Sequence, residues 1–221
     1  MIRKESLVSN VQFEVVGDYD MELKEFHNKD MHKAIQFAID GMHLDLYLQN
    51  KTLLKLYGRY FWYLETNRAT QIIAAYEGDT LAGVLLAEIN GETKKYYSHW
   101  RAMYVKFVDF IQQVFFKESA GLYDDVNKEM FAKYKETHSP DGEIIFLAAN
   151  PDVKVKGVGT MLLNELTDRE KGKQIYLYTD NACTYQFYEH RGFDRVGEKY
   201  IELDFGDKKV PMTCLLYSKV L

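Results

Sequence analysis

EIIFLAANPDVKVKGVGTMLL is the sequence of residues 143 to 163, and it predicts a strand, a loop and a helix in succession. The run from Glu143 to Ala149 is apolar enough for a buried strand. Two closely spaced glycines, Gly157 and Gly159, follow in the loop. Apolar residues then recur at helical spacing, which indicates that a helix begins directly after the loop; they are Val158, Met161, Leu162 and Leu166.

The loop has the composition of an anion-binding site. Glycines allow consecutive backbone N–H groups to converge on one point without a side chain in the way. The start of the helix adds its partial positive charge, and Lys154 and Lys156 add full charges. We therefore expect a diphosphate to bind the loop, which consists of Lys154, Val155, Lys156, Gly157, Val158, Gly159 and Thr160.

The composition is that of a globular protein without long linkers. The chain has 221 residues, of which 47% are hydrophobic and 28% charged, and only three are prolines. These values predict a single domain over residues 1–221. The net charge of −5 argues against nucleic acid as the main partner.

The sequence favours a cytoplasmic protein that is not embedded in a membrane. Its most apolar helical segment, Tyr104 to Phe116, is interrupted by Lys106 and Asp109. Cys183 and Cys214 form no paired motif, and the first residues lack the apolar core of a signal peptide. We expect a reducing compartment.

Periodicity outlines the first half of the chain. A strand is expected near Val11 to Val16, and an amphipathic helix from Asp30 to Leu48. A second helix is expected from Thr52, its candidate cap, to Leu64. Two β-rich runs, 71–76 and 80–89, are joined by a turn at Gly78 and read as a hairpin.

Residues 96–135 look like an inserted pair of helices rich in aromatic side chains. Stripes of this kind at helical spacing are usually packed in a core and less often form a substrate wall. We therefore expect most of these rings to be buried; they are Tyr96, Tyr97, Trp100, Tyr104, Phe107, Phe110, Phe115 and Phe116.

The last third alternates strands and helices. The helix after the glycine loop should stop at Lys171-Gly172, with Gly172 as its cap. A strand is expected at 175–179, a short helix at 184–191, and a final hairpin from Tyr200 to Val220 that turns at Gly206-Asp207.

A second motif, Asn181-Ala-Cys-Thr-Tyr-Gln-Phe-Tyr-Glu-His-Arg-Gly-Phe193, follows the strand at 175–179. With the segment from Pro151 to Gly159, it resembles the paired motifs of the GNAT superfamily of N-acyltransferases. Two positions depart from the family pattern. Lys154 stands where Arg or Gln is usual, which keeps a cation but loses a planar fork, and Thr184 replaces a small Ala.

The resemblance implies an α/β fold with a mixed, strongly twisted sheet of six to seven strands flanked by helices. Acetyl-CoA would lie where the strand 143–149 separates from the strand 175–179. The backbone of Leu147, Ala148 and Ala149 would pair with the pantetheine, and one of its N–H groups would meet the oxyanion. Asn181 and Tyr185 would complete the cofactor site.

Two catalytic residues follow from the same resemblance. Tyr188 matches the motif tyrosine and would protonate the departing thiolate, the alternative being a packed helix residue. Glu143 lies at the spacing from Gly157 seen for the catalytic glutamate of histone-acetylating members. It is the candidate general base, and the alternative is a solvated strand end with water as the base. No histidine or cysteine spacing indicates a metal site.

The resulting hypothesis is an N-acetyltransferase that transfers an acetyl group from acetyl-CoA to a primary amine by direct attack in a ternary complex. A small-molecule acceptor is slightly favoured over a protein, and a homodimer is left open. A catalytically silent acyl-CoA-binding module is the alternative. A dinucleotide-binding oxidoreductase is disfavoured, because Leu162 occupies the third glycine position of its fingerprint.

Overall fold

The fold was analysed in a computed structural model. It describes residues 21–44, 50–115, 121–204 and 209–221. The strand expected at 11–16 and the turn expected at 206–207 lie outside these residues.

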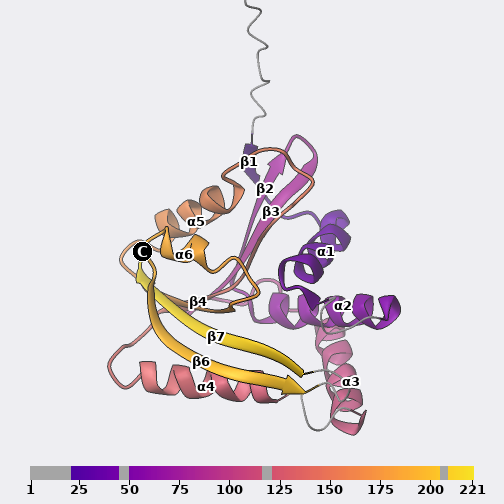
Figure 1. The fold of residues 1–221 in the computed structure, drawn as a ribbon. Helices are drawn as coiled ribbons and strands as arrows, with labels where there is room; N and C mark the ends of the chain where they lie inside the picture. Colours follow the sequence, from indigo (N-terminus) through magenta and orange to yellow (C-terminus); the bar gives the residue numbers. More distant parts are fainter. Residues whose placement is uncertain (1–20, 45–49, 116–120, 205–208) are drawn as a thin grey trace, which may run out of the picture.

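A mixed sheet runs through the molecule in the order β1-β2-β3-β4-β5-β7-β6 (Figure 1). Its β4 and β5 are parallel, and the other neighbouring pairs are antiparallel. This arrangement confirms the predicted fold class. The strands are β1 (Met21–Lys24), β2 (Gln71–Glu77), β3 (Thr80–Ile89), β4 (Gly142–Ala149), β5 (Gln174–Asp180), β6 (Asp194–Asp204) and β7 (Lys209–Val220).

Helices cover both faces of the sheet. Figure 1 shows α5 on one face, whereas α1, α2 and α4 lie on the other. No described helix is both long and apolar enough to cross a membrane. The helices are η1 (Asn28–Asp30, a 3-10 turn), α1 (Met31–Gly41), α2 (Lys51–Arg68), α3 (His99–Phe115), α4 (Leu122–Tyr134), α5 (Val158–Arg169) and α6 (Gln186–Glu189).

The α5 face holds the core that fixes the start of the glycine-loop helix. Leu162 and Leu166 are fully buried against apolar residues of the sheet. Gly83 on β3 allows this close approach, because a Cβ there would lie 2.5 Å from Cγ1 of Val158. The first turn of α5 is therefore held against the β3–β4 ladder.

The opposite face has two cores. Under α1 and α2, the buried Trp62 meets the ring of Phe146 edge-on, with centroids 6.3 Å apart. Under α4, Met130 packs with residues of β6 and β7 such as Leu216. Between these two cores lies the start of β4, where Glu143 is placed.

Several predicted boundaries are wrong by two to seven residues. Helix α1 ends at Gly41 rather than at residue 48. Asn50, not Thr52, caps α2, since its Oδ1 accepts hydrogen bonds from the N–H groups of residues 52 and 53. Strand β6 already begins at Asp194, and α5 ends at Arg169. Gly172 lies beyond that end, with φ at +83°.

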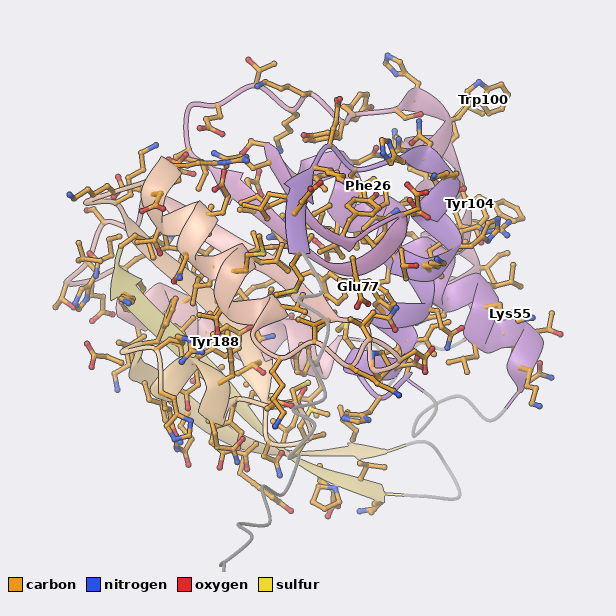
Figure 2. All side chains as sticks on the ribbon, turned by 90° about the horizontal axis from the view of Figure 1, so that it is seen from above. Phe26, Lys55, Glu77, Trp100, Tyr104 and Tyr188 are labelled. Carbon is orange, nitrogen blue, oxygen red and sulfur yellow. The ribbon has the colours of Figure 1, made fainter. Side chains whose placement is uncertain are left out.

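The expectation that the inserted aromatic rings are mostly buried is wrong for α3. Tyr97, Trp100, Phe107 and Phe110 are all exposed, and Figure 2 shows Trp100 pointing away from the rest of the molecule. The helix packs on α2 through its other side, where Val105 is buried. Periodicity identified the apolar face correctly, but nothing in the described part of the chain covers it.

Candidate active site

The parallel strands β4 and β5 separate one residue after the start of β4. Their ladder pairs Gly142 with Ile175 and Glu143 with Tyr176, and within the described strands it contains no further pair. On its other side β4 stays paired with β3 as far as Ala149. One edge of β4 therefore carries backbone groups that are open to a ligand.

A β-bulge lies at the start of this separation. Leu86 pairs with Phe146 and Ala87 with Ile144, so Ile145 is an extra residue in β4. Bulges bend a strand and increase its local twist. The bend turns the later part of β4, which includes Leu147 and Ala148, away from β5.

The glycine loop ends in the backbone geometry that its sequence predicts. Gly157 is the N-cap of α5, with φ at +91° and no side-chain cap. The first intrahelical bond runs from the N–H of Met161 to the carbonyl of Gly157, so the N–H groups of residues 158–160 have no intrahelical partner. Lys154 and Lys156 are exposed beside them and form no ion pair with a described residue. These groups fit a diphosphate.

Arg191 brings an additional cation to the same place. Its guanidinium donates a hydrogen bond to the hydroxyl of Thr160 and lies over the Phe187 ring, 5.1 Å from the centroid. Its Nε is buried and has no hydrogen-bond partner among the described residues. Arg191 lies inside the second motif but was not predicted as a site residue, because only the fold brings the end of α6 to the first turn of α5.

Tyr188 lies on α6 with its ring against the α5-side core. The ring is half-buried and meets the rings of Phe193 and Tyr217, with centroid distances of 5.7 and 6.3 Å. Burial, with a smaller contribution from nearby Cys183, raises the pKa of Tyr188 above its usual value. The phenol therefore stays protonated near neutral pH and can donate a proton.

The other two residues of the predicted cofactor site connect different elements. Asn181 accepts a hydrogen bond from the Thr213 N–H at its Oδ1, 2.7 Å away, and so ties the end of β5 to β7. Tyr185 lies under the guanidinium of Arg195, 5.5 Å from the ring centroid. Both positions border the segment that leads into α6.

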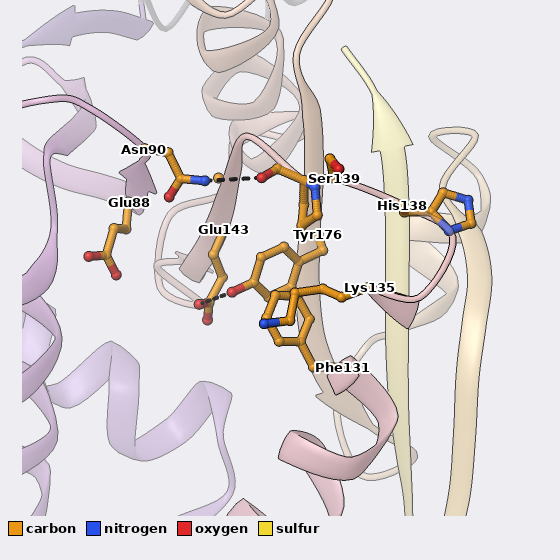
Figure 3. Close-up of a pocket in the computed structure, with 10 residues that line it drawn as sticks. Glu88, Asn90, Phe131, Lys135, His138, Ser139, Glu143 and Tyr176 are labelled. Atoms are coloured by element: carbon orange, nitrogen blue, oxygen red, sulfur yellow. Dashed lines mark hydrogen bonds between the residues drawn. The ribbon is translucent and has the colours of Figure 1, made fainter. Parts of the chain in front are cut away.

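Glu143 is not a solvated strand end, because only 13% of its side chain is exposed. Its Oε2 accepts a hydrogen bond from the Tyr176 hydroxyl, 3.0 Å away (Figure 3), and another from the Arg68 guanidinium. No described residue donates a hydrogen bond to Oε1. Burial raises the pKa of Glu143, although Arg68 and Tyr176 act in the opposite direction.

Arg68 is shared by three carboxylates. Besides Glu143, its Nε lies 3.1 Å from Oε2 of Glu88 and 3.4 Å from Oε2 of Glu65. Lys94 pairs with Glu88 at 2.8 Å. Burial raises the pKa of Glu65 to about 7. When all the acids are ionised, the carboxylates outnumber the cations in this cluster.

A pocket of about 450 Å³ opens beside Glu143. Figure 3 shows the carboxylate of Glu143 facing Tyr176, with Phe131 of α4 and Lys135, the residue after α4, nearby. The pocket thus combines carboxylates, one lysine and two aromatic rings. Its lining consists of Glu88, Asn90, Phe131, Lys135, His138, Ser139, Pro140, Gly142, Glu143 and Tyr176.

The side chains that hold Glu143 in place were not identified from the sequence. Glu88 and Tyr176 are the cross-strand partners of Glu143 on β3 and β5, and Arg68 arrives from α2. No local motif marks any of them. Only the sheet register and the position of α2 place the four side chains together.

Comparisons with known proteins agree with this architecture. Residues 121–193 match the model of the acetyltransferase (GNAT) family, a segment that contains α4, β4, α5, β5 and α6 but not α3. This match confirms the resemblance to the GNAT superfamily. A comparison with curated protein sequences gave no significant match.

Solved structures share the fold over nearly the whole chain. The structure of PH1933 from Pyrococcus horikoshii matches with a TM-score of 0.55 and 17% identity, covering 91% of this chain and 99% of the other. A histone acetyltransferase HPA2 and related acetyltransferase from Corynebacterium glutamicum gives 0.53 and 17%, with coverages of 89% and 94%. An N-acetyltransferase from Staphylococcus aureus gives 0.53 and 15%, with coverages of 90% and 100%.

Proposed function

Since this chain has the fold of GNAT proteins and a GNAT acetyltransferase segment at residues 121–193, we propose that it is an acyl-CoA-dependent N-acetyltransferase. In this proposal residues 1–221 form one catalytic domain in the cytoplasm. The acceptor is a primary amine, and the acyl donor is acetyl-CoA. The observation that carries the proposal is the separation of β4 from β5 between a glycine loop on one side and Glu143 on the other.

The cofactor side supports binding of a diphosphate-linked thioester. Free N–H groups at residues 158–160, the lysines of the loop and Arg191 together favour an anion. The open edge of β4, including Leu147, Ala148 and Ala149, can pair with amides of the pantetheine. An N–H group of the same edge can stabilise the oxyanion of the tetrahedral intermediate.

The acceptor side supports proton removal by Glu143. Arg68 and Tyr176 hold Oε2, which leaves Oε1 to face the pocket. In the proposed reaction Oε1 takes a proton from the ammonium group, and the neutral amine attacks the thioester carbon. The C–S bond then breaks as Tyr188 donates its proton to the thiolate. The second proton of the attacking nitrogen returns through water to the Tyr188 phenolate, and Glu143 releases its proton to solvent.

The carboxylate of Glu143, which lines the pocket and whose Oε1 accepts no hydrogen bond from a described residue, supports a cationic acceptor. A pocket of about 450 Å³ is within the range of small-molecule sites. We therefore favour a small amine over a protein acceptor.

The test is release of free CoA thiol from acetyl-CoA over a panel of small amines and lysine peptides. Tyr188→Phe should lower kcat by roughly 100-fold or more, with an unchanged Kd for acetyl-CoA, because only the acid is lost. Tyr200→Phe is the matched control, since Tyr200 is an exposed tyrosine on β6.

Unchanged turnover in Tyr188→Phe would remove Tyr188 from the mechanism. Tight acetyl-CoA binding without turnover on any amine would instead favour the silent binding module. Absence of acetyl-CoA binding would refute the proposal.

A further inference from the structure

Helix α3 carries an exposed apolar stripe that the proposed acetyl transfer does not use. It consists of Trp100, Met103, Phe107 and Phe110, which are 79%, 61%, 62% and 65% exposed. Their spacing of three, four and three residues places them on one side of the helix. We call these four residues the α3 stripe.

The direction of the stripe is fixed by contacts on the other side of α3. Asp109 accepts a hydrogen bond of 2.6 Å from the Tyr60 hydroxyl, and Arg101 donates one of 3.0 Å to Thr66. Tyr104 and Tyr63 pack edge to face, with centroids 5.3 Å apart. The helix is therefore anchored on α2, and Figure 2 shows Trp100 directed outward.

The stripe is large for a monomer surface. With about 200 Å² for each aromatic side chain, the three rings and Met103 expose roughly 500 Å². Single chains seldom expose apolar patches beyond about 300–600 Å², and patches of that size are often functional. Leu53 and Leu56 of α2 and Tyr97 are also exposed.

The spacing and the area both suit a second copy of the same chain. Apolar residues that alternate at three and four positions form the seam along which two helices pack side by side. A two-fold pairing of two such stripes, with the exposed neighbours, would bury on the order of 1,200 Å², the lower end of specific interfaces. The length of α3, about 25 Å for its 17 residues, is sufficient for this contact.

Charge disfavours the main competing occupant, an anionic membrane. On α3 itself, the exposed residues between positions 99 and 111 include one cation, Lys106, together with His99, whereas the neighbouring α2 exposes Lys51, Lys55 and Arg59. The chain as a whole carries a net charge of −5. Helices that bind anionic lipid surfaces are rich in Lys and Arg on their polar face.

We propose that two copies of this chain associate through their α3 stripes around a two-fold axis. The proposal does not depend on the acetyltransferase function, because none of the four residues lines the pocket beside Glu143. The sequence left open whether the protein is a homodimer, and this proposal assigns the α3 stripe as the interface of that dimer.

Sedimentation velocity of the full chain from 1 to 100 µM would test the interface. The wild type should sediment as a dimer in the upper part of this range, and Phe107→Glu should sediment as a monomer with an unchanged Tm. Tyr200→Glu is the control, because it places the same charge on an exposed aromatic position of β6. It should remain dimeric.

A cross-link provides a second measurement. Phe107→Cys, near the middle of the stripe, should form a disulfide-linked dimer under mild oxidation, whereas Tyr200→Cys should not. A wild type that is monomeric at 100 µM, or a Phe107→Glu variant that stays dimeric, would overturn the proposal. The proposal would also be overturned if the monomer bound to vesicles containing anionic lipid and Phe107→Glu lost this binding.

Discussion

The two sides of the proposed active site are built in different ways. The cofactor side, residues 144–193, uses mainly backbone groups: the open edge of β4 and the free N–H groups at the start of α5. The acceptor side uses side chains from α2, β3, β4 and β5, which meet around Arg68 and Glu143. The first side is continuous in sequence, and the second is assembled from distant segments.

Because of this difference, the two sides should tolerate different substitutions. A backbone site depends on a few conformations that glycine supplies, so it tolerates changes in most side chains but not at Gly157. A site made of charged side chains can change its specificity by single substitutions. We therefore expect substitutions on the cofactor side to affect binding as a whole, and substitutions on the acceptor side to shift pH dependence.

The largest effect is expected on the cofactor side, from Gly157→Val. At φ +91° a β-branched residue is strained, and its side chain enters the space where the diphosphate would bind. The affinity for CoA should fall by roughly 100-fold or more in calorimetry, because the converging N–H groups are displaced or blocked.

Gly172→Val is the matched control, since Gly172 has φ at +83° and equally open surroundings. Both variants should lose about 1–2 kcal/mol of unfolding free energy. If the two glycine variants bind CoA equally well, Gly157 has no role in the cofactor site, and the proposed contrast between the two sides of the active site is wrong.

A moderate effect is expected on the acceptor side, from Arg68→Gln. Arg68 lowers the pKa of Glu143 against the effect of burial, so its removal should raise that pKa further. Loss of one opposite charge shifts a carboxyl pKa by about one unit or more. The acidic limb of kcat/KM should move to higher pH by about that amount, while the rate at high pH changes less.

Arg68→Lys retains the charge and should shift the limb less. An acidic limb that stays at the same pH in Arg68→Gln would show that Glu143 is not the group that titrates there. Thermal unfolding of each variant separates this result from loss of the fold.

The smallest expected effect is a change in the free energy of unfolding, caused by Glu65→Gln. Burial raises the folded pKa of Glu65 to about 7, above its usual 4.5. A raised carboxyl pKa contributes stability that is complete below about pH 4.5 and is lost as the pH rises through about 7. Glu65→Gln lacks this dependence, so between pH 6 and pH 8 it should gain about 1 kcal/mol relative to the wild type.

Urea unfolding at the two pH values would measure this difference. Glu22→Gln, at an exposed carboxylate on β1, controls for the loss of one negative charge. An equal pH dependence in Glu65→Gln and the wild type would show that Glu65 is ionised without penalty, and that the acceptor side is more open to water than its burial indicates.

Much of the fold was predictable because its signals are local. The hairpin β2–β3, the strand β4 and the beginning of α5 follow from periodicity and from glycines at turns, and Gly157 has the positive φ that such a loop needs. The end of α1 and the starts of α2 and β6 were predicted at the wrong residues, because competing caps and turn residues lie within a few positions of each other.

The acceptor side could not be predicted to the same extent. Arg68 lies 75 positions from Glu143, and Tyr176 lies 33 positions from it. Arginine, glutamate and tyrosine are common surface residues, so nothing local distinguishes these from the others. Their contact depends on a strand register and on the placement of α2.

The sequence by itself determined the strand–loop–helix of residues 143–163, since backbone conformation at glycines and apolar periodicity depend on neighbouring residues. It also determined that Trp100, Phe107 and Phe110 share a face of α3. Only the tertiary structure decided that this face stays uncovered, and that Arg68 and Tyr176 hold one oxygen of Glu143. Long-range packing sets both results, because burial and charge pairing depend on which segments meet in space.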